Sequence, residues 1–495
     1  MMYGEEKSDS LIVAANLANN PQGAEPVERR SGAKGNAEQP HMRRTQSRES
    51  MSQRLSRVRE AAKQRKKERF TALFHLLTAE ALENAFLSLS RKAAAGVDGV
   101  RWKDYAENLK VNIADLHRRL HQGSYRAQPG RRHYIPKADG KQRPLGIASL
   151  EDKIVQYALV KILNAVYEND FMGFSYGFRP GRSQHNALDA LATGLVRTNV
   201  NWVLDADISQ FFDKVSHEWL IRFIEHRIGD QRVIRLIRKW LTAGTSEEGE
   251  WRASEEGTPQ GAVISPLLAN IYLHYVFDLW AHQWRRRHAT GNVVMVRYAD
   301  DIVIGFDKRI DAQCFRIAMQ CRLKEFGLTV HPKKTRLMEF GRFAAENRAS
   351  RGKGKPETFN FLGFTHISGK DRSGRFMLIR KTRRDRMTAT LKAIKDGLRK
   401  RWHYSIPEQG KWLRRVVQGY LNYHSVPGNY PMMRKFRIYV TDLWRRALRR
   451  RSQQDDTTWT KANRLAAVWL PKVRVLHPWP VERFTARHPR QEPGA

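Results

Sequence analysis

A strand pattern in the middle of the chain carries two acidic residues on one face. The alternate positions of residues 201–208 are apolar or small, namely Trp202, Leu204, Ala206 and Ile208. Because side chains of a strand alternate between its two faces, this pattern places Val203, Asp205 and Asp207 together on the opposite face. The spacing does not by itself choose which of the two acids carries a function.

Two further β-rich runs, residues 293–298 and 302–306, predict a β-hairpin. Only Ala299, Asp300 and Asp301 separate the two runs, so we expect aspartates at the turn. Aspartate is common in solvated turns. Here, however, an acid pair lies between runs that should be buried, and buried carboxylates need a cation.

After about residue 381 the pattern becomes helical throughout. Apolar residues recur at helical spacing in three stretches, which contain Met387, Leu391, Ile394 and Leu398, then Trp412, Val416, Tyr420 and Tyr423, then Phe436, Tyr439, Val440, Leu443 and Trp444. We expect three amphipathic helices there. Since residues 200–370 mix strand and helix patterns, the predicted fold class is α+β.

The charge balance points to a polyanionic partner. The sequence has 89 Lys and Arg against 50 Asp and Glu, a formal net charge of +39. Such a surplus indicates nucleic acid or an anionic membrane surface. Residues 257–277 form a long uncharged run, but its prolines, glycines and polar side chains make it a poor membrane span. We therefore expect no membrane partner and a nucleic-acid partner.

The cysteine content favours a reducing compartment. Cys314 and Cys321 lie seven positions apart in a predicted helix, too far apart to form a disulfide. The first residues are acidic and do not resemble a signal peptide. We expect a cytoplasmic location.

Carboxylates that converge in a basic, nucleic-acid-binding protein indicate phosphoryl transfer with Mg²⁺. With Asp207 contributed by the strand, the acid pair of the hairpin gains a third carboxylate. The predicted cofactor is therefore Mg²⁺, bound as two ions.

Three motifs in order carry a family resemblance. Residues 298–301, Tyr-Ala-Asp-Asp, resemble the Tyr-x-Asp-Asp box of reverse transcriptases. Residues 207–213 resemble their first palm motif, and residues 257–270 resemble the motif that lines the nucleotide pocket. Residues 96–99 and 177–182 are similar to fingers motifs of the group II intron class. The chain thus resembles a bacterial group II intron-encoded reverse transcriptase/maturase, an RNA-directed DNA polymerase.

The resemblance implies a right-hand polymerase fold. Its parts would be a disordered N-terminal extension (1–55), a basic arm and fingers (56–195), a palm with an antiparallel sheet (196–375), a helical thumb/maturase domain (376–455) and a basic C-terminal segment (456–495). The chain ends without the paired cysteines of an HNH endonuclease, so we expect no endonuclease domain.

The resemblance also implies site residues. The catalytic acids would be Asp207, Asp300 and Asp301, and Ile208 would join them around the metal. The nucleotide contacts would be Lys137, Lys141, Arg143, Phe212, Gln260 and Lys334, with Phe212 excluding a 2′-hydroxyl. A helical face bearing Arg445, Arg446, Arg449 and Arg450 suits the phosphates of structured RNA.

The expected partners are group II intron RNA, an RNA template with a DNA primer, and deoxynucleoside triphosphates. The expected activities are cDNA synthesis together with assistance in splicing and retrohoming. Two alternatives share these motifs. One is a domesticated relative in repair or phage defence, and the other is a splicing cofactor with little polymerase activity.

Overall fold

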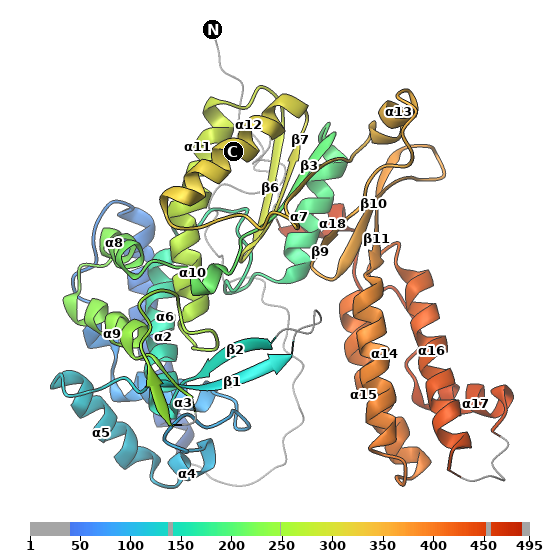
Figure 1. Ribbon diagram of the computed structural model, residues 1–495. Helices are drawn as coiled ribbons and strands as arrows, with labels where there is room; N and C mark the ends of the chain where they lie inside the picture. Colours follow the sequence, from blue (N-terminus) through green and yellow to red (C-terminus); the bar gives the residue numbers. More distant parts are fainter. Residues whose placement is uncertain (1–39, 137–141, 248, 452–456, 488–495) are drawn as a thin grey trace.

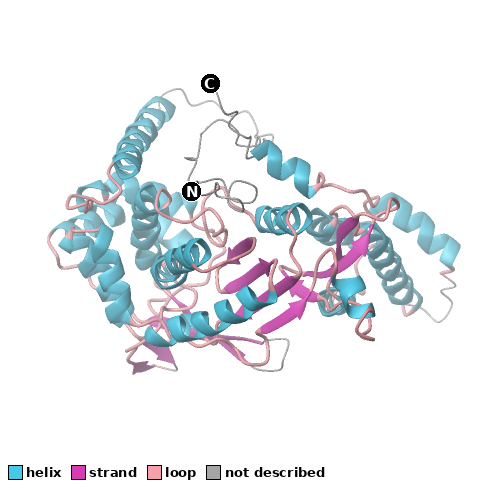
Figure 2. Ribbon diagram, turned by 90° about the horizontal axis from the view of Figure 1, so that it is seen from above, coloured by secondary structure: helices cyan, strands magenta, loops and turns pink. Residues whose placement is uncertain are grey.

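The computed structural model describes residues 40–136, 142–247, 249–451 and 457–487 (Figure 1). Lys137 and Lys141 lie outside these residues. The α+β fold class is confirmed: antiparallel strands run through the middle of the molecule with helices on either side (Figure 2). No helix in the described ranges is both long and apolar enough to cross a membrane.

The N-terminal part is mainly helical. Its helices are α2 (Pro40–Gln64), α3 (Ala79–Ser88), α4 (Trp102–Glu107), α5 (Leu109–His121) and α6 (Leu150–Tyr167), with a 3-10 turn at Phe74–Leu76. Strands β1 (Gly130–Pro136) and β2 (Gln142–Ile147) form a hairpin that continues into β4 (Thr245–Glu247) and β5 (Glu250–Arg252). This sheet projects from the helices beneath the central sheet (Figure 1).

Helix α2 corrects the expected boundary at residue 55. The helix already begins at Pro40, in a stretch whose composition predicted disorder. Met51, Leu55 and Val58 are partly buried against the main core, and Ala62 is fully buried. Since these residues recur every three or four positions, they form one narrow apolar stripe in an otherwise polar helix.

The central sheet is antiparallel, as predicted. Its strands are β3 (Trp202–Asp207), β6 (Val293–Tyr298), β7 (Asp301–Phe306) and β8 (Arg336–Glu339), in the order β6-β7-β3-β8. The surrounding helices are α7 (Gln184–Arg197), α8 (His217–Arg227), α9 (Gln231–Thr242), α10 (Ser265–Leu273), α11 (Leu279–Arg287), α12 (Arg309–Glu325) and α13 (Ala344–Ala349). A π-helical turn, His274–Asp278, joins α10 to α11.

Serine caps fix the starts of several helices around this sheet. The Ser149, Ser183 and Ser216 side chains accept hydrogen bonds from the first-turn amides of α6, α7 and α8. Each cap satisfies a backbone donor that a helix start leaves without a partner. Both cysteines lie on α12, exposed and free.

The C-terminal part begins with a second sheet and continues into helices. Strands β9 (Phe359–Phe361), β10 (Phe364–Lys370) and β11 (Phe376–Thr382) precede α14 (Arg384–Arg399), α15 (Ile406–His424), α16 (Tyr430–Arg449) and α17 (Trp459–Trp469). The expected boundary at residue 375 falls between β10 and β11, which pair over the whole length of β11. The three predicted amphipathic helices correspond to α14, α15 and α16.

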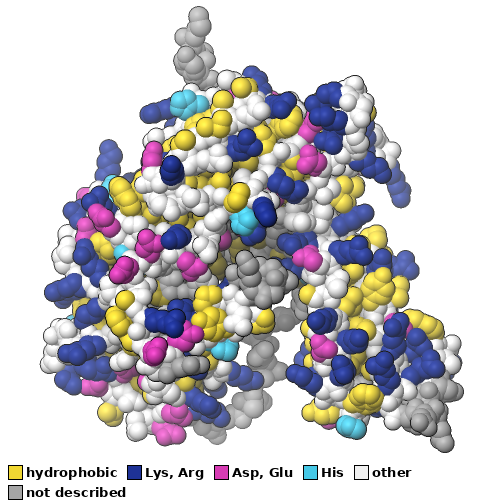
Figure 3. Space-filling model, in the orientation of Figure 1, with side chains coloured by type: hydrophobic (Ala, Val, Ile, Leu, Met, Phe, Trp, Pro, Cys, Tyr) yellow, Lys and Arg dark blue, Asp and Glu magenta, His cyan; other side chains and the backbone are white. Residues whose placement is uncertain are grey.

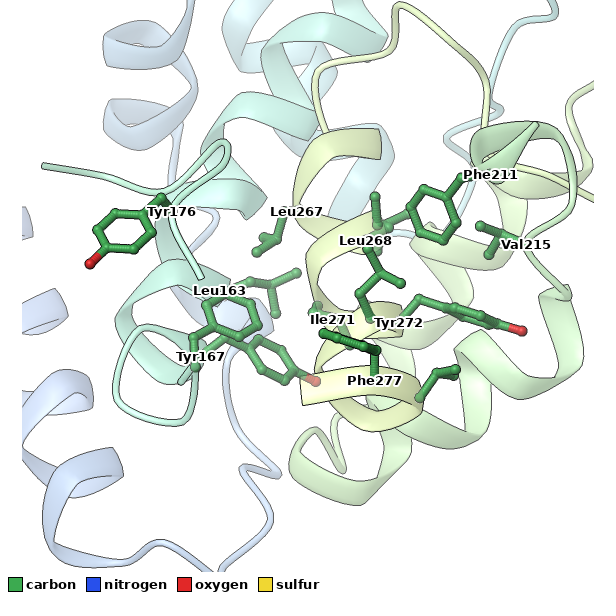
Figure 4. Close-up of a cluster of buried hydrophobic side chains, with 14 of the residues drawn as sticks. Leu163, Tyr167, Tyr176, Phe211, Val215, Leu267, Leu268, Ile271, Tyr272 and Phe277 are labelled. Carbon is green, nitrogen blue, oxygen red and sulfur yellow. The ribbon is translucent and has the colours of Figure 1, made fainter. Parts of the chain in front are cut away.

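Two hydrophobic cores hold these parts. The main core extends from the N-terminal helices through the central sheet, and Figure 4 shows one portion of it around Phe211, Ile271 and Tyr272. A separate core lies between α14, α15, α16 and α17. The last helix, α18 (Pro480–Arg487), returns to α7, where Arg483 forms an ion pair with the buried Asp189.

Candidate active site

The predicted acids meet at one end of the central sheet. Strands β6 and β7 are joined by a two-residue turn, Ala299–Asp300, with Tyr298 and Asp301 as the closing pair. On the other side of β7, strand β3 places Asp207 directly opposite Asp301. The hairpin is therefore confirmed, and Asp207, Asp300 and Asp301 are neighbours although about ninety residues separate them in sequence.

The electrostatics show a cluster of carboxylates that is short of positive charge. Burial raises the pKa of Asp301 to about 6, and Asp300 and Asp207 add to this effect. Burial is the main cause that raises the pKa of Asp300, and the nearby Asp207 raises it further, whereas Arg143 and Lys334 lower it. Like charges held this close disfavour the ionised forms.

Two neighbours complete this cluster. Lys334 Nζ lies 2.9 Å from Asp207 Oδ2, so an ammonium group already occupies one side of that carboxylate. Asp205 is half-buried, and burial raises its pKa to about 7, with Asp301 and Asp207 contributing. Asp205 is therefore not simply an exposed residue of the strand.

Within the described ranges, no three Asp, Glu, His or Cys side chains stand close enough to form a metal-binding set. The chemistry of the three acids nevertheless fits a hard divalent cation, because carboxylate oxygens are the ligands that Mg²⁺ prefers. Ile208, the fourth residue predicted at the metal, is a buried residue next to Asp207.

A buried ion pair that the motifs did not reveal lies directly beneath the turn. Arg297 and Asp278 are both fully buried, and their two bonds measure 2.7 and 2.6 Å. The guanidinium also donates to Asn270 Oδ1 (3.1 Å), Ser175 Oγ (2.6 Å) and the Ala299 carbonyl oxygen (3.0 Å). All five N–H donors of this arginine are therefore used. Its position inside an apolar strand was the only signal in the sequence.

Two local features make this network fit. The π-helical turn contains Asp278, and such turns are often found at functional sites. A Cβ atom placed on Gly177 would overlap the backbone nitrogen of Ala299. Only glycine lets this loop come so close to the Ala299–Asp300 turn.

Backbone strain is concentrated around the acids. Among the described residues, the non-glycine residues with positive φ are Phe178 (57°), Gln210 (47°), Ala299 (56°) and Leu362 (44°). Phe178, Gln210 and Ala299 lie within the motif segments named above, whereas Leu362 lies in the turn between β9 and β10. Such conformations cost about 1 kcal/mol or more and gather at functional sites.

Of the predicted nucleotide contacts that the structure describes, Arg143 and Lys334 act on the acids. Arg143 is exposed on β2, and the Gly146 amide of that strand donates to the Gln260 carbonyl oxygen (2.7 Å). The Gln260 side chain donates to Asp213 Oδ1 (2.7 Å). Phe212 is half-buried, and its carbonyl oxygen accepts a hydrogen bond from Thr258 (2.7 Å).

The predicted RNA-binding arginines do not share one side of α16. Arg445 is bonded to Asp442 and packs over the Trp459 ring at 4.9 Å, so it is largely covered. Arg446 is also paired with Asp442 (2.7 Å) but remains exposed, and with Arg450 it lines a cavity of about 110 Å³ between α14 and α16. Arg449 is exposed. Adjacent positions on a helix diverge by about 100°, so Arg445 faces Trp459 while Arg446 faces the cavity beside α14.

Comparisons with known proteins agree with this geometry. A family model described as reverse transcriptase (RNA-dependent DNA polymerase) matches residues 135–366. Protein YkfC of Escherichia coli is 38% identical over 271 residues, which cover 48% of this chain and 71% of YkfC. The group II intron-encoded protein LtrA of Lactococcus lactis is 37% identical over 223 residues. The chain belongs to the group II intron reverse transcriptase/maturase family.

The match to this family does not extend over whole relatives. The aligned part covers 44% of this chain and 37% of LtrA. The putative COX1/OXI3 intron 1 protein of Saccharomyces cerevisiae is 26% identical over 393 residues, 66% of this chain and 46% of that protein. The chain thus spans less than half of these two relatives.

Proposed function

We propose that this chain is an RNA-directed DNA polymerase that extends a DNA primer on an RNA template with deoxynucleoside triphosphates. The observation that carries the proposal is the register of the central sheet. It sets Asp207 against Asp301 and places Asp300 in the adjoining turn. In a chain with a net charge of +39, such a cluster suits a polyanionic substrate.

In this proposal Asp207, Asp300 and Asp301, with the backbone of Ile208, hold Mg²⁺ as two ions. When bound, Mg²⁺ neutralises the developing charge on the phosphates and lowers the pKa of the attacking hydroxyl. Asp207 would then give up its ion pair with Lys334, and the Lys334 ammonium would be free to contact a phosphate.

The nucleotide is held from the N-terminal side. Arg143, together with Lys137 and Lys141, would bind the triphosphate, since fixed cations favour its negative charge. Phe212 would lie under the sugar, because its backbone is fixed by Thr258 while its ring is only half-buried. Gln260 would contact the nucleotide from the loop that is bonded to β2.

We also propose that the chain binds group II intron RNA and assists its splicing and retrohoming. Lys and Arg side chains cover much of the visible face of the helical bundle formed by α14–α17 (Figure 3). Arg446 and Arg449 on α16, and Arg450 directly after it, are exposed and available to such a partner. Such a surface reads phosphates and RNA shape, and not base sequence. A cytoplasmic location, proposed from the free cysteines, is compatible with this partner.

A primer-extension assay tests the polymerase. Asp300→Asn removes charge from the cluster and should abolish Mg²⁺-dependent extension of a DNA primer on RNA, while template binding survives. Asp371→Asn is the matched control, because Asp371 belongs to a surface ion pair with Arg375 far from the acids in sequence. Extension by the Asp300 variant at the wild-type rate would refute the assignment.

A splicing assay separates the second activity. Asp300→Asn protein should still accelerate splicing of its intron, because binding energy and not the acids would favour the active RNA fold. If wild-type protein extends primers but no intron surrounds its gene, the domesticated alternative replaces the maturase proposal.

A further inference from the structure

An exposed aromatic ring lies beside the catalytic turn and has no role in the site described above. Phe178 is 51% exposed and has a φ of 57°. A phenylalanine in this conformation is strained, and its exposed ring adds little to the core. Both features are unfavourable for folding, so the position calls for a functional explanation.

The loop that carries Phe178 is rigid. The side chain of Arg179 is 2% exposed, forms an ion pair with Glu168 (2.9 Å) and donates to the Met172 and Ser175 carbonyl oxygens (both 2.8 Å). Arg182 packs over the Tyr176 ring at 5.1 Å and donates to the Ser175 carbonyl oxygen (3.1 Å). Figure 4 shows Tyr176 at the edge of the main core. The loop therefore presents Phe178 in a fixed place.

The same loop is bonded to the strand that ends at the catalytic turn. The Tyr176 amide donates to the Arg297 carbonyl oxygen (2.8 Å), and the Asn270 side chain donates to the Gly177 carbonyl oxygen (2.7 Å). The Phe178 and Tyr298 rings then lie 6.3 Å apart at 46°. The two rings form one aromatic pair next to Asp300.

This pair lies on the side of the acids toward the helical bundle. Tyr298 hydrogen-bonds with Gln184 at the start of α7. Burial and the nearby Tyr298 raise the pKa of Tyr423 to about 12, and Tyr423 donates to the Leu362 carbonyl oxygen (2.8 Å). Arg143 on β2 and Lys334 in the loop before β8 act on Asp300, and Arg383, directly before α14, also acts on Asp301. None of these three cations is among the groups that shift the pKa of Tyr298, so the aromatic pair suits an apolar face better than a triphosphate.

We propose that Phe178, with Tyr298, packs against the 3′-terminal nucleoside of the DNA primer. An aromatic ring suits this ligand because every base and sugar offers an apolar face, so the contact tolerates any primer sequence. The inference rests on the proposed polymerase function and identifies a residue that holds the primer end during each addition.

The test uses the full chain, a labelled DNA primer annealed to RNA, and single-turnover incorporation. Phe178→Ala should weaken binding of the primer–template duplex by about fivefold or more. About fivefold is the lower end of the effect expected when one aromatic–base stack is lost. The KM for the deoxynucleotide and the binding of unprimed RNA should stay within about twofold of wild type. Phe178→Tyr should restore duplex binding.

Two further variants control for folding and for exposure. Phe178→Gly removes the ring but accepts the positive φ, so it should fold at least as well as wild type and bind the duplex as weakly as Phe178→Ala. Phe343→Ala removes another exposed phenylalanine (41%). Phe343 follows the end of β8 where Glu339 pairs with Trp202, at the other end of β3 from Asp207. This variant should therefore bind the duplex as wild type does.

Unchanged duplex binding in Phe178→Ala and Phe178→Gly would overturn the inference, as would a raised deoxynucleotide KM with normal duplex binding. Failure of the wild-type protein to extend any primer would instead refute the proposed function. The two failures are therefore distinguishable.

Discussion

Replacing Arg297 by Ala removes the cation beneath the Ala299–Asp300 turn and leaves Asp278 buried without its partner. Both side chains are 0% exposed. Removal of one member of such a pair costs about 3–5 kcal/mol. Loss of the bonds to Asn270, Ser175 and Ala299 exposes more unsatisfied groups, so we expect the upper part of that range.

Arg297→Lys is the more informative variant. An ammonium keeps the charge opposite Asp278 but cannot reproduce five donors in a planar fork. We expect a loss of about 1–3 kcal/mol, from buried acceptors left without a donor. If the bond to the Ala299 carbonyl holds the turn in its strained conformation, kcat should fall while the KM for the deoxynucleotide stays unchanged.

Urea unfolding and single-nucleotide incorporation measure these two effects. Arg375→Lys is the matched control, because Arg375 is exposed and an ion pair at the surface contributes little to stability. The double variant Arg297→Met with Asp278→Leu should regain stability without regaining kcat, since apolar replacement of a buried pair is often neutral. Wild-type stability and wild-type kcat in Arg297→Lys would refute the positioning role.

Four other predictions follow from the same geometry. Gly177→Ala should lower stability and extension together, because the new methyl overlaps the Ala299 backbone; normal extension would contradict the close approach. Phe212→Ala should raise ribonucleotide incorporation relative to deoxynucleotide, measured by competition. Mg²⁺ should raise the melting temperature more at pH 7.5 than at pH 5. Burial raises the pKa of Asp301 to about 6, so the carboxylates become ionised, and destabilise the folded state, as pH rises through that value. Mg²⁺ then has a negative charge to neutralise. Joint replacement of Arg446, Arg449 and Arg450 by Ala should weaken intron RNA binding and flatten its salt dependence, whereas Arg445→Ala should act chiefly on stability.

Local patterns predicted the parts of the site that depend on local chemistry. The hairpin, the strand of Asp207 and three amphipathic helices follow from periodicity and turn residues. The alternation of apolar and polar residues placed Val203 on the acid-bearing face of its strand, yet Val203 is fully buried. Helices pack against this sheet, so neither face is fully solvated.

What the sequence did not reveal depends on contacts between distant residues. Arg297 reaches Ser175 and Asp278 from positions that no periodic pattern connects. The π-helical turn is invisible to hydropathy, because it changes the register of one helix by a single residue. The start of α2 was missed since only a few apolar residues of that helix contact the core.

The most direct test of the central claim is a structure of the chain with a primer–template duplex and an incoming deoxynucleotide. The account predicts that the primer 3′ end and the α-phosphate lie between Asp207 and Asp300, with the Phe178 ring against the terminal nucleoside. A duplex bound elsewhere, with the primer end remote from these acids, would contradict it.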